Sequence, residues 1–291
     1  MATAAALSRN HEVTIVAKNL PGDAPTIEWA SPWAGASFIA GSCSSLQEAK
    51  MQLEAFAELW RLSIEHPESS VKRILIEDLH DNKTEDEVWW KDFMPEVSPL
   101  ARIGDASFKR MNLSSLSDAC SLGHDVLVNA TGFGSLTLAD VLDEDVDMVR
   151  GQTMVVRSDY NKLFMRDSGD RYTYAIPRLD GTVVLGGVRQ RDTLDSKVDW
   201  DICRDIAQRI HKNLPDHFPA EMSDLQNIGH NVGIRPGRRS GIRIEKEEKN
   251  GQKIVHVYGA AGGGYIFGAG MARAAATLVE EFLTPSFPAK L

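Results

Sequence analysis

The alternation of apolar and polar residues predicts helices and strands from the start of the chain. Residues 1–9 are alanine-rich and predict the end of a helix. Residues 11–18 and 71–78 are short apolar runs rich in β-branched residues, and both predict strands. Residues 46–66 carry apolar side chains at helical spacing and predict an amphipathic helix. Residues 125–132 predict a further strand that ends in a glycine turn.

The second half of the chain begins with a different pattern. Residues 152–159, 171–178 and 181–190 are three strand-like runs separated by turn residues, which predicts an antiparallel sheet. Residues 199–215 predict a helix, and residues 254–283 predict a strand, a glycine-rich loop and a long helix. We therefore predict an α/β nucleotide-binding domain with a second, sheet-based domain inserted into it.

Composition narrows the classes of function. The 291 residues carry a formal net charge of -9, which argues against a nucleic-acid interface because such an interface needs a basic face. It leaves room for a local basic pocket that binds a small anion. The three cysteines lie far apart, which fits a reducing compartment and gives no zinc signature. No apolar run is long enough to predict a membrane span.

One short segment, residues 229–245, gathers four arginines. They are Arg235, Arg238, Arg239 and Arg243. Arginine is the usual residue for a bidentate grip on a carboxylate. The glycines and the proline between them predict a shaped loop, and we expect one functional arginine and three structural ones. The alternative is a solvated basic patch whose charges pair with the acidic residues downstream.

Two further segments are candidates for a site. The six glycines within residues 257–270 join a predicted strand to a helix, where backbone N–H groups and the helix dipole favour an anion or a flat ring. The alternative is a helix start that only needs small residues. Tyr172 and Tyr174 fall on one side of a predicted strand, since the strand period is two. They either line a pocket or pack in the core.

The acidic run at residues 143–147 lacks the spacing of a calcium loop. We therefore predict a solvated face or a helix cap for it, and no metal site.

Taken together, five segments resemble the D-amino-acid oxidase family of FAD enzymes, most closely its fungal members. They occur in the family's order along the chain: residues 29–38, 125–132 with 149–152, 172–187, 232–247 and 257–270. The resemblance implies a mixed α/β fold, with an FAD-binding Rossmann-like domain and an inserted, mainly antiparallel β-sheet substrate domain. The implied boundaries are 1–70, 101–150 and 225–291 for the FAD-binding domain and 71–100 and 151–224 for the substrate domain.

The resemblance also implies roles for individual residues. Arg238 matches the arginine that holds the substrate carboxylate, and Tyr174 matches the tyrosine whose hydroxyl meets the same group. The residues that match flavin contacts are Ala34, Gly35, Ala36, Thr131, Gly262, Gly263, Gly264, Tyr265 and Ile266. The implied reaction is oxidative deamination of a D-amino acid by FAD and oxygen. D-aspartate oxidation, with Arg189 or Arg239 supplying extra charge, and a non-catalytic relative with impaired FAD binding are the alternatives.

The sequence also departs from the family pattern. In the family, a strand and a GxGxxG loop precede the first helix and hold the FAD pyrophosphate, but this sequence starts at what resembles that helix, residues 1–9. Family members also have further strands and a helix after the segment that matches residues 89–100, and this sequence has no match to them. The chain ends in Ala289-Lys290-Leu291, close to the peroxisomal Ser-Lys-Leu signal. We therefore expect import into the peroxisome matrix through its receptor, with the cytoplasm as the alternative. We expect no nucleic-acid or membrane partner, and the sequence leaves a homodimer open.

Overall fold

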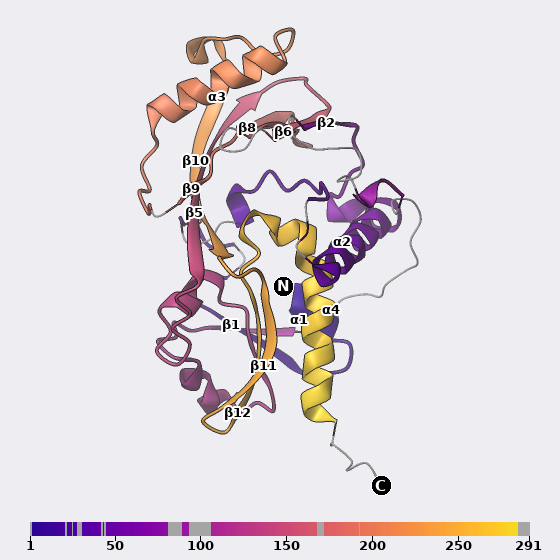
Figure 1. The fold of residues 1–291 in the computed structure, drawn as a ribbon, viewed down its shortest axis with the longest axis vertical. Coiled ribbons are helices and arrows are strands. Elements are labelled where there is room, and N and C mark those ends of the chain that lie inside the picture. The colour runs from indigo at the N-terminus through magenta and orange to yellow at the C-terminus, as the bar shows by residue number, and fades with distance from the viewer. Residues whose placement is uncertain are drawn as a thin grey trace.

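A computed structural model gives the fold of the chain (Figure 1). It describes residues 2–20, 22–24, 26–27, 31–41, 43, 45–80, 89–92, 106–167, 172–191 and 193–284. Within these residues, no helix has both the length and the apolar character needed to cross a membrane. The C-terminal tripeptide Ala289-Lys290-Leu291 lies outside the described residues.

The largest element of the fold is a seven-stranded sheet, which runs in Figure 1 from β10 and β5 on the left to β2 at the upper right. Its strands run in the order β10-β5-β8-β7-β6-β2, with β9 paired to β5. Their bounds are β2 (Ile76–His80), β5 (Val146–Arg157), β6 (Leu163–Asp167), β7 (Thr173–Pro177), β8 (Thr182–Gly186), β9 (Gln190–Arg191) and β10 (Asn227–Arg238). All neighbours are antiparallel except β2 and β6. The prediction of a mainly antiparallel sheet is confirmed.

The two faces of this sheet are covered differently. Helix α3 (Trp200–Asn213) lies on one face, where its apolar side packs with Ala175, Val183 and Leu185 in a buried cluster. Tyr172, Tyr174 and Ile176 point to the opposite face, because side chains alternate along a strand. That face turns toward the rest of the molecule, and the candidate site lies on it.

The remaining strands form two smaller sheets. Strands β4 (Leu127–Asn129), β11 (Arg243–Lys249) and β12 (Gln252–Tyr258) make a three-stranded sheet in which β4 and β12 run parallel. Strands β1 (Val13–Ala17) and β3 (Ala106–Arg110) make a parallel pair.

Three helices accompany these small sheets. They are α1 (Ala2–Leu7), α2 (Leu46–Glu65) and α4 (Gly264–Leu283). Helix α4 packs on β11 and β12, α1 contacts β1 and α4, and α2 packs on α4. Val13 of β1, Val128 of β4 and Val255 of β12 share one apolar cluster with α4. The short 3-10 helices are η1 (Ser31–Trp33), η2 (Pro67–Ser69), η4 (Trp89–Asp92), η5 (Leu116–Leu122), η6 (Gly132–Leu136), η8 (Met222–Asp224) and η9 (Ala261–Gly263).

The two small sheets share a core but do not join. Among the described residues, no strand pairs with the free edge of β1 or with that of β4. Parallel strands are normally buried on both faces, yet four of the five residues of β3 are exposed. This half of the fold therefore consists of a two-stranded parallel sheet and a three-stranded mixed sheet, which share an apolar cluster with α4.

Most elements occur where the sequence predicts them, with one important exception. Residues 229–245 are not a shaped loop, because residues 227–238 form the long strand β10, which pairs with β5 over its whole length. Its glycines and Pro236 are tolerated here because β10 lies at the edge of the sheet. β10 lies within the segment 225–291 predicted for the FAD-binding domain, yet it pairs with β5 and so belongs to the seven-stranded sheet.

Candidate active site

The segments that carry the predicted site residues meet on β10 between Gly233 and Gly237. A Cβ added at Gly233 would lie 2.8 Å from the ring of Trp33, and one at Gly237 would lie 3.2 Å from Ala261. A Cβ at Gly132 would lie 3.2 Å from Pro236. Residues 31–36, 131–136 and 259–264 therefore all approach one short stretch of β10.

Arg235 occupies the centre of this stretch. Its side chain lies on the same face as Tyr172 and Tyr174, and both phenols interact with its guanidinium. Its Nη1 donates a hydrogen bond of 3.3 Å to the carbonyl oxygen of Val188. Among the described residues, no carboxylate lies within ion-pair distance of Arg235. A partly buried guanidinium without an acidic partner is a ready site for an anion.

The two tyrosines form the wall beside Arg235. Tyr172 and Tyr174 are 7% and 6% exposed, and their ring centroids lie 5.3 Å apart. A Cβ at Gly186 would lie 2.2 Å from the ring of Tyr174, so only glycine fits at that position. The prediction that both phenols share one face is confirmed by this geometry.

The surroundings keep the phenol of Tyr174 and the guanidinium of Arg235 protonated, so both can donate hydrogen bonds. Burial, with a contribution from Tyr172, raises the pKa of Tyr174 far above its usual value, while Arg235 and Arg189 act in the opposite direction. Burial acts to lower the pKa of Arg235, but the two phenols outweigh it and the pKa is raised. Tyr174 is therefore a neutral O–H donor and Arg235 a cation across the physiological range.

Arg238 lies elsewhere, and its assignment as the carboxylate-binding arginine is corrected. Its Nε donates to Asp143 at 2.9 Å, and its Nη2 pairs with Asp145 at 3.3 Å. The guanidinium is thus neutralised by two acids. The physical reason is the strand period: positions three apart on β10 face opposite sides of the sheet, so Arg235 and Arg238 cannot share a pocket.

The other two arginines of the segment also bond to neighbouring residues. Arg239 donates to the carbonyl oxygen of Glu144 at 3.2 Å. Arg243 donates to the hydroxyl of Tyr258 at 2.7 Å and pairs with Glu245. Among the described residues, Arg238 and Arg243 pair with carboxylates, whereas Arg235 and Arg239 donate only to backbone carbonyl oxygens. Of the latter two, Arg235 is the one that lies against Tyr172 and Tyr174.

The acidic run 143–147 is not the solvated face that the sequence suggested. Asp143 is 9% exposed and accepts hydrogen bonds from Tyr258 at 2.7 Å and from Arg238. Asp147 is 5% exposed and pairs with Arg191. These carboxylates neutralise arginines of neighbouring strands. No group of three or more potential metal ligands occurs in the part of the chain that the structure describes.

The predicted flavin contacts at residues 34–36 lie on the tyrosine face. A Cβ at Gly35 would lie 2.4 Å from Ile176, and Ala36 has a positive φ of 58°. Arg178 donates to the carbonyl oxygen of Ala34 at 3.1 Å, which fixes the segment against the end of β7.

Thr131 is engaged locally. Its hydroxyl donates to Asn129 at 2.8 Å and contacts the Ser135 hydroxyl at 2.9 Å. Its backbone N–H also donates to Asn129, so the turn after β4 is tightly held.

The glycine-rich segment forms the start of α4. Gly263 is the N-cap residue and makes no side-chain cap, and the first turn carries no acidic residue. Nothing lies within 4 Å of a Cβ placed at Gly264, and one at Gly262 would face Arg235 at 3.6 Å. Tyr265 is half exposed and Ile266 is partly buried. Uncapped N–H donors beside open space fit the pyrimidine edge of an isoalloxazine ring.

These residues therefore fit the ring end of FAD. The segments at 34–36 and 262–266 approach β10 on the face that also holds Arg235 and Tyr174.

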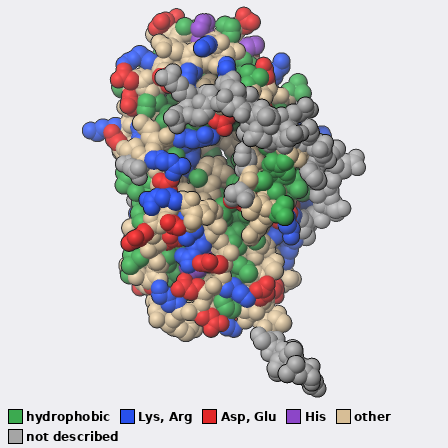
Figure 2. Space-filling model, viewed as in Figure 1, with side chains coloured by type: hydrophobic (Ala, Val, Ile, Leu, Met, Phe, Trp, Pro, Cys, Tyr) green, Lys and Arg blue, Asp and Glu red, His purple; other side chains and the backbone are tan. Residues whose placement is uncertain are grey.

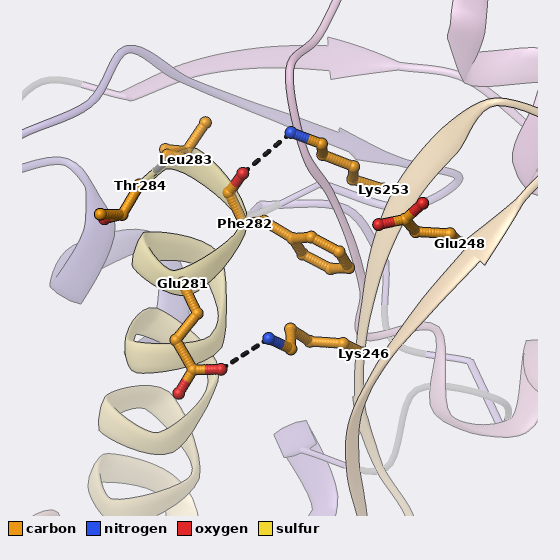
Figure 3. Close-up of a pocket in the computed structure, with 7 residues that line it drawn as sticks. All are labelled: Lys246, Glu248, Lys253, Glu281, Phe282, Leu283 and Thr284. Atoms are coloured by element: carbon orange, nitrogen blue, oxygen red, sulfur yellow. Dashed lines mark hydrogen bonds and ion pairs between the residues drawn. The ribbon is translucent and has the colours of Figure 1, made fainter. Parts of the chain in front are cut away.

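A surface pocket also lies away from this site. A surface pocket of about 590 Å³ lies between β11, β12 and the end of α4 (Figure 3). Its two lysines are already engaged, because Lys253 donates to the carbonyl oxygen of Phe282 at 2.8 Å and Lys246 pairs with Glu281 at 2.6 Å. Lys253 therefore caps the C-terminus of α4. Figure 2 shows acidic and basic side chains intermixed over this lower part of the face.

Comparison with known proteins identifies the family. Residues 108–278 match the family model "FAD dependent oxidoreductase". A D-amino-acid oxidase of Fusarium vanettenii is 29% identical over 97% of this chain and 94% of its own length. A D-aspartate oxidase of Talaromyces thermophilus is 26% identical over 96% of this chain and 92% of its own. The chain belongs to the FAD-dependent oxidoreductase family, and FAD is its cofactor, as predicted.

A solved structure supports the fold. Glycine oxidase from Geobacillus kaustophilus superimposes with a TM-score of 0.70, covering 99% of this chain and 93% of its own, at 17% identity. This likeness confirms the predicted architecture, a Rossmann-like domain with a β-sheet domain.

Two signals in the sequence point to Arg235. The first is the strand period, which separates Arg235 from Arg238 when residues 227–238 form a strand. Gly151 carries the second signal, because a glycine inside an apolar strand marks a close approach. Here that approach is made by the guanidinium of Arg235.

Proposed function

We propose that this chain catalyses the FAD-dependent oxidative deamination of D-amino acids to 2-oxo acids, ammonia and hydrogen peroxide. One observation carries the proposal: Arg235 lies beside Tyr172 and Tyr174 without a carboxylate partner in the described part of the chain. A site of this kind suits the carboxylate of an amino acid. The preference for the D-enantiomer rests on the names of the relatives.

Each residue has a role in this proposal. Arg235 binds the substrate carboxylate through two N–H groups, and the hydroxyl of Tyr174 donates to the same group. Tyr172 and Tyr174 exclude water from one side of the substrate. When bound, FAD supplies the hydride acceptor for the substrate Cα and the subsequent reaction with oxygen. Uncapped N–H groups at the start of α4 stabilise negative charge near the ring.

The test uses the purified chain with added FAD. Hydrogen peroxide and 2-oxo acid are measured with D-alanine and with L-alanine as substrates. The proposal predicts equal amounts of both products with the D-enantiomer and none with the L-enantiomer. A yellow, flavin-loaded protein that oxidises no D-amino acid would contradict it.

A second candidate is D-aspartate oxidation, which Arg189 favours. The guanidinium of Arg189 lies 3.9 Å from the ring centre of Tyr172, and its ion pair with Asp167 is long, at 3.8 Å, and half exposed. Arg189 thus offers a second cation near Arg235 for a side-chain carboxylate. The ratio of kcat/KM for D-aspartate to that for D-alanine separates the two candidates. The resemblance also suggests Arg239 for this role, but Arg239 is exposed and donates to the carbonyl oxygen of Glu144.

The third candidate is a non-catalytic relative that binds FAD poorly. It is favoured by the edges of β1 and β4, which pair with no strand among the residues that the structure describes. A flavin absorbance spectrum of the purified chain, before and after incubation with FAD, separates this candidate from both enzymes.

Peroxisomal import is a separate proposal. It rests on Ala289-Lys290-Leu291 and on the peroxide that the proposed reaction releases. A fluorescent protein that carries the last ten or so residues of this chain should collect in peroxisomes, and diffuse cytoplasmic signal would contradict the proposal.

A further inference from the structure

The chain between β8 and α3 is held in place by arginine side chains. We call its described residues, 187–191 and 193–199, the β8–α3 connection. Arg209 Nη2 donates to the carbonyl oxygen of Gly187 at 3.0 Å, and Arg235 Nη1 donates to that of Val188 at 3.3 Å. The first residues of the connection therefore touch the candidate site directly.

Arg150 holds the rest of the connection. It is 2% exposed and lies on β5 opposite Gln190 of β9. Its Nη1 donates to Gln190 Oε1 at 2.5 Å. Its Nε and Nη2 donate to the carbonyl oxygens of Asp195 and Lys197 at 2.7 and 2.6 Å. One buried guanidinium thus fixes three points of the connection.

Gln152, two residues along β5, fixes its end. Gln152 Oε1 accepts from the backbone N–H of Asp199 at 2.9 Å, and its Nε2 donates to the carbonyl oxygen of Asp199 at 2.7 Å. Arg150 donates to Gln152 at 3.0 Å, which locks the two side chains together. Gly151 between them leaves the opposite face free for Arg235. Arg150 and Gln152 therefore hold the connection on one face of the sheet, while Gly151 makes space for Arg235 on the other.

We propose that Arg150 is a positioning residue for the substrate site, acting through the stretch 188–190. That stretch supplies the carbonyl of Val188 that orients Arg235, and it carries Arg189 over Tyr172. The Gln190 side chain is anchored by Arg150. The inference rests on the proposed function, because it assigns Arg150 to the orientation of the carboxylate-binding arginine.

The chemistry requires such an anchor. A carboxylate gains most from a guanidinium when two N–H groups point at it, so a small rotation of Arg235 weakens binding. Side chains at a site are held to the required geometry by the groups behind them. Lysine cannot replace Arg150, because one ammonium cannot reach four acceptors in a planar fan.

The test compares Arg150→Lys and Gln190→Ala with the control Arg157→Lys, an exposed arginine on the same strand. Amide hydrogen exchange of peptides covering 188–199 is measured by mass spectrometry. We expect about tenfold faster exchange in both test variants and no change in the control. Gln190→Ala removes one anchor without burying an unpaired charge, so it answers the question even if Arg150→Lys does not fold.

Activity gives the second readout. In Gln190→Ala we expect KM for D-alanine to rise about fivefold while kcat stays within about twofold, because chemistry at the flavin is unchanged. Unchanged exchange across 188–199, or an unchanged KM, would overturn the assignment. Absence of peroxide formation in the unsubstituted chain would instead contradict the proposed function, and the exchange comparison would still decide the positioning role.

Discussion

The guanidinium of Arg235 lies directly over Gly151 on the neighbouring strand. A Cβ added at Gly151 would sit 2.5 Å from Nη1 of Arg235 and 2.6 Å from its Cζ. The two strands are paired so that Gly151 stands opposite Gly233. The missing side chain lets Arg235 cross β5 and reach Val188 beyond it. This crossing directs Arg235, which has no carboxylate partner among the described residues, to the tyrosine face.

Gly151→Ala tests this relationship without removing a charge. The end of a flexible arginine side chain can move away from the new methyl group, so we expect the protein to fold with nearly unchanged stability. The displaced guanidinium should raise KM for D-alanine about tenfold or more, which corresponds to about 1.4 kcal/mol or more of lost binding. Steady-state kinetics and a thermal melt measure the two effects. A KM equal to that of the unsubstituted chain would contradict the crossing.

Arg238 should behave as a structural residue. Arg238→Met leaves the buried Asp143 without its closest cation, although Tyr258 still donates to it and Arg243 lies 3.6 Å away. We expect the free energy of unfolding to fall by about 1–3 kcal/mol. Chemical denaturation measures this loss. A variant as stable as the unsubstituted chain would show that the ion pair contributes nothing.

The sequence predicted the family, the cofactor and the face that carries the tyrosines. It misplaced the arginine because glycine and proline in residues 229–245 are typical of loops, whereas β10 tolerates them at a sheet edge. Side chains alternate between two faces in a strand but not in a loop. A loop prediction for this segment therefore gives no reason to place Arg235 and Arg238 on different faces. Local sequence patterns therefore predicted where most helices and strands lie, but not which arginines of residues 229–245 share a face of the sheet.

Arg189 should decide the response to an acidic side chain. Its guanidinium covers Tyr172 and is only weakly paired with Asp167. If it binds a side-chain carboxylate, Arg189→Met should lower kcat/KM for D-aspartate about tenfold or more and leave D-alanine within about twofold. Kinetics with both substrates measure the ratio. Equal losses for the two substrates would assign Arg189 to the support of Tyr172 instead.

A buried polar network links β4, β11 and β12 beneath the candidate cofactor segments. Asn129 Oδ1 accepts from both Thr131 groups, so its amide nitrogen donates to His256 Nδ1 at 3.1 Å. The other ring nitrogen of His256 then carries the proton and donates to Glu247 at 2.8 Å. His256 is fully buried and neutral in this arrangement.

This arrangement predicts a pH dependence of stability. Burial, aided by Arg243, lowers the pKa of His256 below its usual value of 6.5. The unfolded chain therefore binds a proton that the folded chain does not, and stability falls as pH drops below about 6.5. Each such proton contributes at most about 1.4 kcal/mol per pH unit. His256→Gln should reduce the slope between pH 6.5 and 5 in denaturation curves. An unchanged slope would mean that His256 does not titrate in this range.

Part of the cofactor site could not be predicted from sequence, because it depends on how distant segments meet. The residues at 34–36 and 262–264 are small and therefore give a local signal. Their approach to one stretch of β10 depends on the pairing of β10 with β5 and on the contact of Trp33 with Gly233. The separation of β1 from β4 likewise appears only in the sheet topology.

The most direct test compares Arg235→Met with Arg238→Met in D-amino-acid oxidation. The purified variants are saturated with FAD, and kcat/KM for D-alanine is measured by peroxide release. The account predicts a loss of about a hundredfold or more for Arg235→Met, since the carboxylate loses its charged partner, and a change within about threefold for Arg238→Met. Full activity in Arg235→Met, or a severe loss confined to Arg238→Met, would contradict the assignment of Arg235 as the carboxylate-binding residue.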